Sequence, residues 1–233
     1  MPLWMNVPQE TRQASGMGYS RTLTNQKRKR KTYGRGKNFK RKVLDVFPAK
    51  HLSGNSGVTI NNAEIYSMNL TAQIAQGTGL GQREGDTVHL EAVKLEGFFQ
   101  SSTASNAYKF RLIVGYSGEE YGQVTLTSGV FGTSELFLPN TVATVVNGVI
   151  NPKAFTMLYD EVIDMNSQIE GDRTLQSVRS TIKLNKTFSY QANASVYGKT
   201  QNLYVIVVSY APDVAVGVAN GSAVISYDLI FKD

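Results

Sequence analysis

The stretch from Asn25 to Lys42 limits most strongly what this chain can fold into, because it cannot contribute to a hydrophobic core. Ten of its eighteen residues are Lys or Arg, and none is acidic. Burying so many like charges without partners is very costly, so we expect the stretch to stay disordered or to order against a polyanion. A folded domain must therefore be built from the residues that follow it.

The chain divides at about residue 50 into two parts of opposite charge. Residues 1–50 carry 13 Lys or Arg and 2 Asp or Glu, a balance of +11. The remaining residues carry 11 Lys or Arg and 16 Asp or Glu, a balance of −5, and the two parts sum to the +6 of the 233-residue chain. We therefore predict a basic arm over residues 1–50 and one folded domain over residues 51–233. The charge of the arm points to nucleic acid or an anionic membrane as its partner.

The composition of the arm favours nucleic acid as this partner. Lys and Arg neutralise phosphates and release counterions largely without regard to sequence. Tyr33 and Phe39 can stack on unpaired bases, while Gly34 and Gly36 keep the backbone flexible. The candidate nucleic-acid-binding residues are Lys27, Arg28, Lys29, Arg30, Lys31, Tyr33, Arg35, Lys37, Phe39, Lys40, Arg41 and Lys42. A short KRKRK cluster can instead be a nuclear-import signal or a solubilising tail, and import and binding can use the same residues.

The rest of the chain has the periodicity of an all-β domain. No segment has a convincing amphipathic helix of ten residues or more, and apolar residues instead alternate with polar ones along successive segments. We predict strands over Asn62–Ala75, Thr87–Gln100, Tyr108–Ser117, Ala154–Met165, Ser180–Tyr190, Leu203–Tyr210 and Val224–Phe231. The long span Gly118–Pro152 is expected to form surface loops with one or two short strands. About eight antiparallel strands with long connections fit a jelly-roll sandwich of two sheets.

Several local features refine this prediction. Apolar residues in Thr87–Gln100 change phase between Ala92 and Val93, which is typical of a β-bulge. Leu203–Tyr210 is apolar on both faces and should be a central strand. Pro48–Gly57 is rich in turn-forming residues and is predicted to be a loop, after a short apolar transition at Val43–Phe47 that could pair with a sheet edge.

The glycine-rich run from Gly77 to Gly81 could suggest a phosphate-binding loop. It lacks the G-x-G-x-x-G spacing and the Gly-Lys-Ser/Thr ending of such loops, and no helix is predicted after it. We expect a turn between two strands, with glycines at positions of positive φ.

The sequence gives no support for an enzyme or for a resident cofactor. There is no Cys, which removes disulfides, thiolate metal sites and Cys nucleophiles. His51 is predicted in a loop and His89 on the outward side of a strand, with no motif such as G-x-S-x-G. No apolar run approaches the 18 residues of a membrane-spanning helix, and the first residues do not form a secretory signal.

One acidic stretch could bind a cation such as calcium between subunits. Its members are Asp160, Glu161, Asp164, Glu170 and Asp172. We favour a solvated or ion-paired surface over a metal site.

A basic arm followed by a jelly-roll pattern resembles the capsid proteins of small icosahedral viruses. The segment Gln76–Asp86, QGTGLGQREGD, leads into the apolar positions Val88, Leu90 and Leu95. It is similar to the G-T-G…R-x-G-D loop before a strand in capsid proteins of circular single-stranded DNA viruses that encode their own replication initiator. Similar loops occur in some small satellite RNA viruses.

This resemblance implies a T=1 shell of ~60 copies with closed symmetry. It also implies an arm that points inward onto a single-stranded circular DNA genome. The chain would then be found in the virion, and in the host nucleus during assembly, with a nuclear-import receptor as a host partner.

Two other classes remain open, a non-viral nucleic-acid-binding β protein and a lectin-like or enzymatic jelly roll with an import signal. Within the viral class, the capsid of a small single-stranded RNA or satellite virus is the alternative, and the sequence identifies no attachment factor.

Overall fold

The computed structural model describes residues 48–101, 107–117, 129–130, 136–138, 148–166, 175–191, 198–199 and 201–233. All of them belong to one unit, Phe47–Asp233. The twelve candidate nucleic-acid-binding residues and the transition at Val43–Phe47 lie outside the described residues. The division of the chain at residue 50 stays a prediction.

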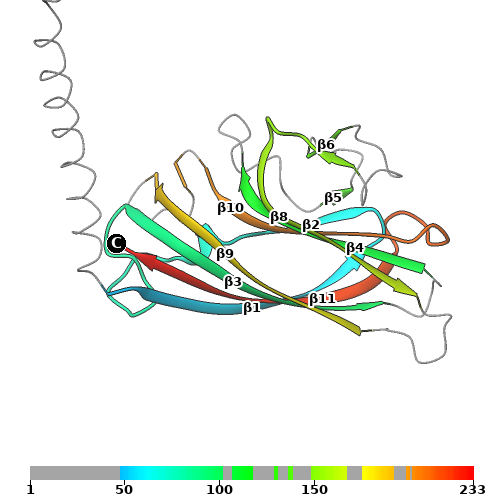
Figure 1. Cartoon of the computed structure of the whole chain (residues 1–233), viewed down its shortest axis with the longest axis horizontal. Helices are drawn as coiled ribbons and strands as arrows, with labels where there is room; N and C mark the ends of the chain where they lie inside the picture. Colours follow the sequence, from blue (N-terminus) through cyan, green and yellow to red (C-terminus); the bar gives the residue numbers. More distant parts are fainter. Residues whose placement is uncertain are drawn as a thin grey trace, which may run out of the picture. The chain divides into compact units, whose positions relative to one another are not determined.

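Two antiparallel sheets face one another in this unit (Figure 1). The first has the order β1-β11-β3-β9 and the second has the order β5-β2-β10-β4-β8. The strands of the first sheet are β1 (Lys50–Asn61), β11 (Ala219–Lys232), β3 (Thr87–Ser101) and β9 (Leu175–Ser189). Those of the second are β5 (Gly129–Val130), β2 (Glu64–Asn69), β10 (Leu203–Tyr210), β4 (Ala107–Ser117) and β8 (Phe155–Asn166).

The order of the eight long strands is that of a jelly roll. Numbered along the chain, the first, eighth, third and sixth form one sheet, and the second, seventh, fourth and fifth form the other. All connections except the one between β4 and β8 cross from one sheet to the other, as in nested Greek keys. The predicted fold class is confirmed, and the only helix in the described residues is a 3₁₀ turn at Thr71–Gln73 (η1).

The main core lies between the two sheets. Every second residue of a long strand points inward, so β11 buries Ala223, Ile225, Leu229 and Phe231 while its alternate residues face outward. β10 is buried along nearly its whole length, as its apolar sequence predicts for a central strand. These alternating faces are what brings the two sheets together, because each sheet alone would expose an apolar surface to water.

A second, smaller core covers the outer face of the five-stranded sheet. β6 (Phe137–Leu138) pairs with β7 (Val149–Ile150). From this pair and its neighbours, Leu136, Phe137 and Ile150 pack against outward-facing residues of the sheet such as Ile113 and Ile206. The described residues of the span Gly118–Pro152 contain three short strands, β5, β6 and β7, where one or two were predicted. Residues of this span bury a face of the sheet that would otherwise be exposed.

The β-bulge predicted between Ala92 and Val93 is present one residue earlier, at Glu91. Leu90 pairs with Phe231 and Ala92 with Ile230, so no residue of β11 lies opposite Glu91 in the strand register. The irregularity continues into β9, where two residues lie opposite Glu91 and one of them, Asn185, has a φ of 46°. Asn tolerates this left-handed conformation better than most residues, which suits it to a bulge position.

The prediction of a loop over Pro48–Gly57 was wrong, because β1 begins at Lys50. Its small residues pair in unbroken register with β11, from Lys50 opposite Phe231 to Ile60 opposite Gly221. Gly54 is required here for packing, since a Cβ at this position would collide with the Tyr227 hydroxyl oxygen. Local turn propensity is thus outweighed by pairing with an apolar partner strand. His51, expected in a loop, lies on this strand.

Candidate nucleic-acid interface and assembly surfaces

The start of β1 is held in place by Lys50. Its Nζ atom donates hydrogen bonds to the Asp233 carboxylate at 2.9 Å, the Glu84 carboxylate at 3.0 Å and the Gln82 carbonyl at 3.1 Å. Burial works to lower the pKa of Lys50, but the bonds to Asp233 and Glu84 outweigh it and raise the pKa. Lys50 therefore joins the start of β1 to the β2–β3 loop and the C-terminal residue, and its charge is already neutralised.

The glycine-rich run forms a closed turn, as predicted. The Gln82 amide donates to the Gly79 carbonyl at 3.0 Å, and the Gly79 amide donates to the Gln82 side-chain oxygen at 2.9 Å. The expected reason for the glycines was wrong, since in the described residues the glycine with positive φ is Gly217. A Cβ at Gly81 would instead come within 3.2 Å of the His51 carbonyl oxygen, so this glycine allows the loop to approach β1.

Arg83 is the residue that holds this loop in place. Its side chain is fully buried, its guanidinium lies 3.8 Å from the centre of the Tyr190 ring, and it donates a hydrogen bond to the Gly85 carbonyl. Tyr190 in turn donates to the Thr71 carbonyl at 2.9 Å. Burial raises the pKa of Tyr190 to about 12, although Arg83 acts to lower it. The R-x-G-D segment thus places its arginine in the interior, where it cannot contact nucleic acid.

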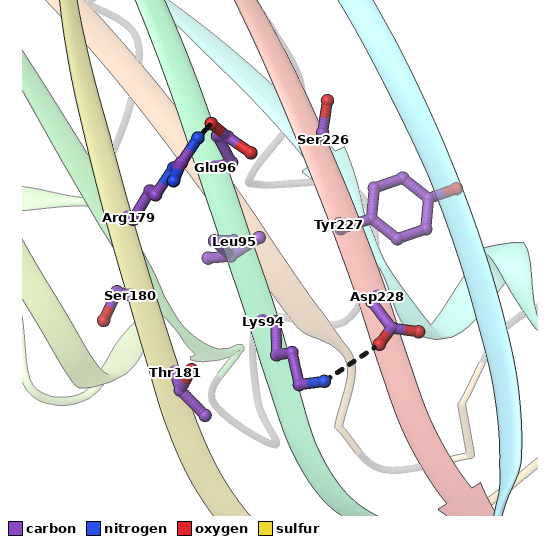
Figure 2. Close-up of a pocket in the computed structure, with 9 residues that line it drawn as sticks. All are labelled: Lys94, Leu95, Glu96, Arg179, Ser180, Thr181, Ser226, Tyr227 and Asp228. Carbon is purple, nitrogen blue, oxygen red and sulfur yellow. Dashed lines mark hydrogen bonds and ion pairs between the residues drawn. The ribbon is translucent and has the colours of Figure 1, made fainter.

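Four charged residues on the outer face of the four-stranded sheet form two ion pairs (Figure 2). Arg179 donates to the Glu96 carboxylate at 2.6 Å, and Lys94 lies 3.5 Å from the Asp228 carboxylate. Both pairs are set by strand register, because Glu96 is opposite Arg179 and Lys94 is opposite Asp228. The hollow of about 510 Å³ that these residues line has two cations and two anions, and so it offers a polyanion no net attraction.

This face brings together a serine, a histidine and an aspartate in an arrangement unsuited to catalysis. Ser53 donates to Asp228 at 3.2 Å, and the His51 ring nitrogen lies 3.4 Å from the same carboxylate. The carboxylate is in the middle, so the histidine cannot accept the proton of the serine hydroxyl as a general base must. His89 contacts the Thr187 hydroxyl at 3.1 Å and takes part in no such group.

Two members of the acidic stretch on β8, Asp160 and Asp164, form ion pairs with β4, whereas Glu161 accepts a hydrogen bond from the Tyr159 hydroxyl. Arg111 makes a two-point contact with Asp160, at 2.7 and 2.6 Å, and its remaining nitrogen donates to the Gly148 carbonyl at 2.7 Å. Lys109 pairs with Asp164 at 3.1 Å. No group of three or more His, Asp or Glu residues in the described ranges could hold a metal ion, while Glu170 and Asp172 lie outside those ranges.

Large apolar side chains are exposed at several places in the described unit, among them Leu80, Val149, Met157, Leu175, Val216 and Val224. Leu80, at the tip of the Gly79–Gln82 turn, has 93% of its surface exposed. A second hollow of about 510 Å³ lies between β7 and β8, where the exposed residues Val149 and Met157 surround the buried Phe155. Within the described ranges no helix has the length and apolar character to span a bilayer.

The signals for these features were present in the sequence but incomplete. Arg111 stands out as a cation in a strand whose other residues are mostly apolar, which indicates a buried partner without identifying Asp160. Arg83 has no such signal, because its partner Tyr190 is distant in the chain. Leu80 is a single large apolar residue between glycines, a pattern that the prediction of a turn did not use.

Comparison with known proteins gives structural likeness only. No protein family matches the sequence, and no curated protein does. A chain from desmodium yellow mottle tymovirus has 10% identity and a TM-score of 0.33, with 78% of this chain and 88% of that chain covered. A chain from turnip yellow mosaic virus has 9% identity and a TM-score of 0.38, and the match covers 80% of this chain and 82% of that chain. The third structure is a full particle of Israeli acute paralysis virus heated to 63 degrees. A chain from it has 10% identity and a TM-score of 0.33, and the match covers 100% of this chain and 84% of that chain. At such scores the assignment of the fold rests on the strand order itself.

Proposed function

We propose that this chain is a viral coat protein that assembles into a small closed shell and packages its genome through the basic arm. The observation that carries the proposal is the combination of a jelly-roll strand order with an adjoining segment of charge +11. Jelly rolls are used by capsid, lectin and cupin proteins, and a long cationic segment distinguishes the first use from the other two.

The described unit supports a structural role over a chemical one. The buried Arg111 is paired with the partly exposed Asp160, and the Ser53–Asp228–His51 group has the wrong order for a nucleophile. The four charges around the hollow on the outer sheet face form two ion pairs, whereas the arm carries a large excess of positive charge and is the stronger candidate to attract a polyanion. Assembly and packaging would then use different parts of one chain.

The nucleic acid is proposed to be single-stranded circular DNA, enclosed in a T=1 shell of ~60 copies. This choice follows from the resemblance of the loop Gln76–Asp86, and single-stranded RNA is the alternative because phosphate contacts do not distinguish the two. Nuclear import through the KRKRK cluster would precede assembly, since the same residues are covered once they bind the genome.

Electron microscopy of the purified full-length protein, with nuclease typing of its contents, tests this proposal. We expect closed particles of megadalton mass whose nucleic acid resists added nuclease until the particles are opened, and is then digested by DNase but not by RNase. RNase-sensitive contents would replace DNA by RNA and leave the coat function standing. A monomer that never forms particles, with or without nucleic acid, would refute the coat function.

A further inference from the structure

We propose that the hollow on the outer face of the four-stranded sheet binds a neutral sugar ring, and that the coat uses it to attach to glycans. The hollow has a volume of about 510 Å³, within the range of about 300–1,000 Å³ that is typical of ligand sites. The sugar site is argued from the described residues alone, whereas its use in attachment rests on the proposed coat function.

The balance of charge in the hollow favours a neutral ligand. Lys94 and Arg179 supply two positive charges, and Glu96 and Asp228 supply two negative charges. A charged ligand gains no net attraction here, because it meets two like charges together with two opposite ones. A hydroxyl group is uncharged, and it can donate a hydrogen bond to a carboxylate while it accepts one from a neighbouring cation. A ligand with several hydroxyls therefore matches both ion pairs at once.

The polar groups of the hollow converge on one strip of sheet that crosses β9, β3 and β11. Strand register places Ser226 opposite Glu96, so that a hydroxyl stands beside this carboxylate. It also places Thr181 opposite Lys94 (Figure 2). The Arg179 side chain is 77% exposed, so most of its N–H donors face solvent even though it binds Glu96. Because the strands fix these groups before binding, little conformational entropy is lost when a ligand arrives.

An exposed aromatic side chain lies beside this polar strip. Phe98 is two residues after Glu96 on β3, so both side chains are on the outer face. Phe98 is 37% exposed, and it lies opposite Val224 of β11, which is exposed as well. The negative face of an aromatic ring attracts the positively polarised C–H groups of a sugar ring. Polar groups next to an apolar platform are what a pyranose requires, since it has both hydroxyls and a C–H face.

One such site should bind weakly, and a shell would compensate for this. Most of the groups around the hollow are open to water, so we expect a Kd of about 1 mM for a monosaccharide. In a shell of ~60 copies many sites face one glycan-bearing surface together. Multivalent binding of this kind can raise the affinity by about 10²–10⁴ without any new contact.

Saturation-transfer NMR with the full-length protein tests the sugar site. The probes are the methyl glycosides of glucose, galactose, mannose and N-acetylglucosamine, and we expect at least one of them to receive saturation. Asp228→Asn should weaken binding of that probe by about tenfold, the effect of losing one hydrogen bond to a charged group. Phe98→Ala should weaken it by about fivefold. The matched controls are Asp164→Asn and Leu138→Ala, which change exposed residues outside the four-stranded sheet and should bind as the natural chain does.

The outcomes separate the sugar site from its use by the coat. Saturation of none of the neutral glycosides, or unchanged binding by Asp228→Asn and Phe98→Ala, would overturn the sugar site. Saturation of N-acetylneuraminic acid in their place would overturn the choice of a neutral ligand. Particles that bind no glycan on an array, although dissociated subunits bind the glycoside, would overturn attachment and leave the sugar site standing. A chain that stays monomeric would refute the coat function, and the NMR measurement on the monomer would still decide the sugar site.

Discussion

Replacing Arg83 by Ala is expected to destabilise the folded domain strongly. The substitution removes a buried cation–π contact with Tyr190, worth about 2 kcal/mol when desolvated, and a charged hydrogen bond to the Gly85 carbonyl, worth about 1.5–3 kcal/mol. The ion pair with Asp86 adds little, because its atoms are 3.8 Å apart and Asp86 is half exposed. We expect a loss of about 4 kcal/mol in the free energy of unfolding.

Thermal unfolding of dissociated subunits, followed by circular dichroism, measures this loss. For a domain of this size about 4 kcal/mol corresponds to a decrease of roughly 10 °C in Tm. Arg83→Lys should lower Tm by about half as much as Arg83→Ala, since a lysine keeps the charge but not the planar group that stacks on Tyr190. The matched control is Arg179→Ala, whose ion pair with Glu96 is exposed and should contribute less than about 1 kcal/mol.

The competing interpretation is that Arg83 belongs to the nucleic-acid interface. In that case Arg83→Ala would weaken the binding of single-stranded DNA and leave Tm within about 2 °C of the natural chain. That result would refute a structural role for the arginine of the R-x-G-D segment.

Three further predictions concern other parts of the chain. Arg111→Ala removes a buried guanidinium and its two-point contact with the partly exposed Asp160, and should cost about 1.5–3 kcal/mol in urea unfolding. Arg111→Met, which keeps the apolar packing of the side-chain stem, should cost less, and equal costs would contradict the account. Burial raises the pKa of Tyr190 from 10.0 to about 12. Its contribution to the free energy of unfolding is therefore complete below pH 10, and it falls by up to about 3 kcal/mol as the pH rises to 12. The natural chain should therefore be more stable than Tyr190→Phe at pH 9 and less stable near pH 12, and a constant difference would count against this. Finally, binding of single-stranded DNA should weaken with salt, with a log–log slope approaching about −7 if all ten cations of Asn25–Lys42 contact phosphates. A variant with Gln at these ten positions should show almost no slope.

The sequence was sufficient to predict the features that depend on local pattern. Alternation with a period of two identified β3, β4 and β11 because one face of each strand must be apolar, and the bulge was visible because the extra residue at Glu91 shifts that phase. The fold class followed from the number of such segments and the lengths of their connections.

What the sequence did not predict depends on partners far away in the chain. β1 contains Ser, Gly and Asn that alone favour turns, and only its pairing with β11 makes it a strand. Gly54 is needed because of Tyr227, and Arg83 is buried because of Tyr190. These contacts join residues more than one hundred positions apart, so no local pattern records them. The twelve arm residues stay a prediction, because they lie outside the described residues.

Deletion of residues 1–42 tests most directly the claim that the basic arm packages the genome. The measurement is the nuclease-protected nucleic acid per particle, determined for full-length and truncated protein after purification on a density gradient. We predict that the truncated chain keeps the thermal unfolding of the folded domain and loses the protected nucleic acid. Truncated particles that enclose as much protected nucleic acid as full-length particles would contradict the account.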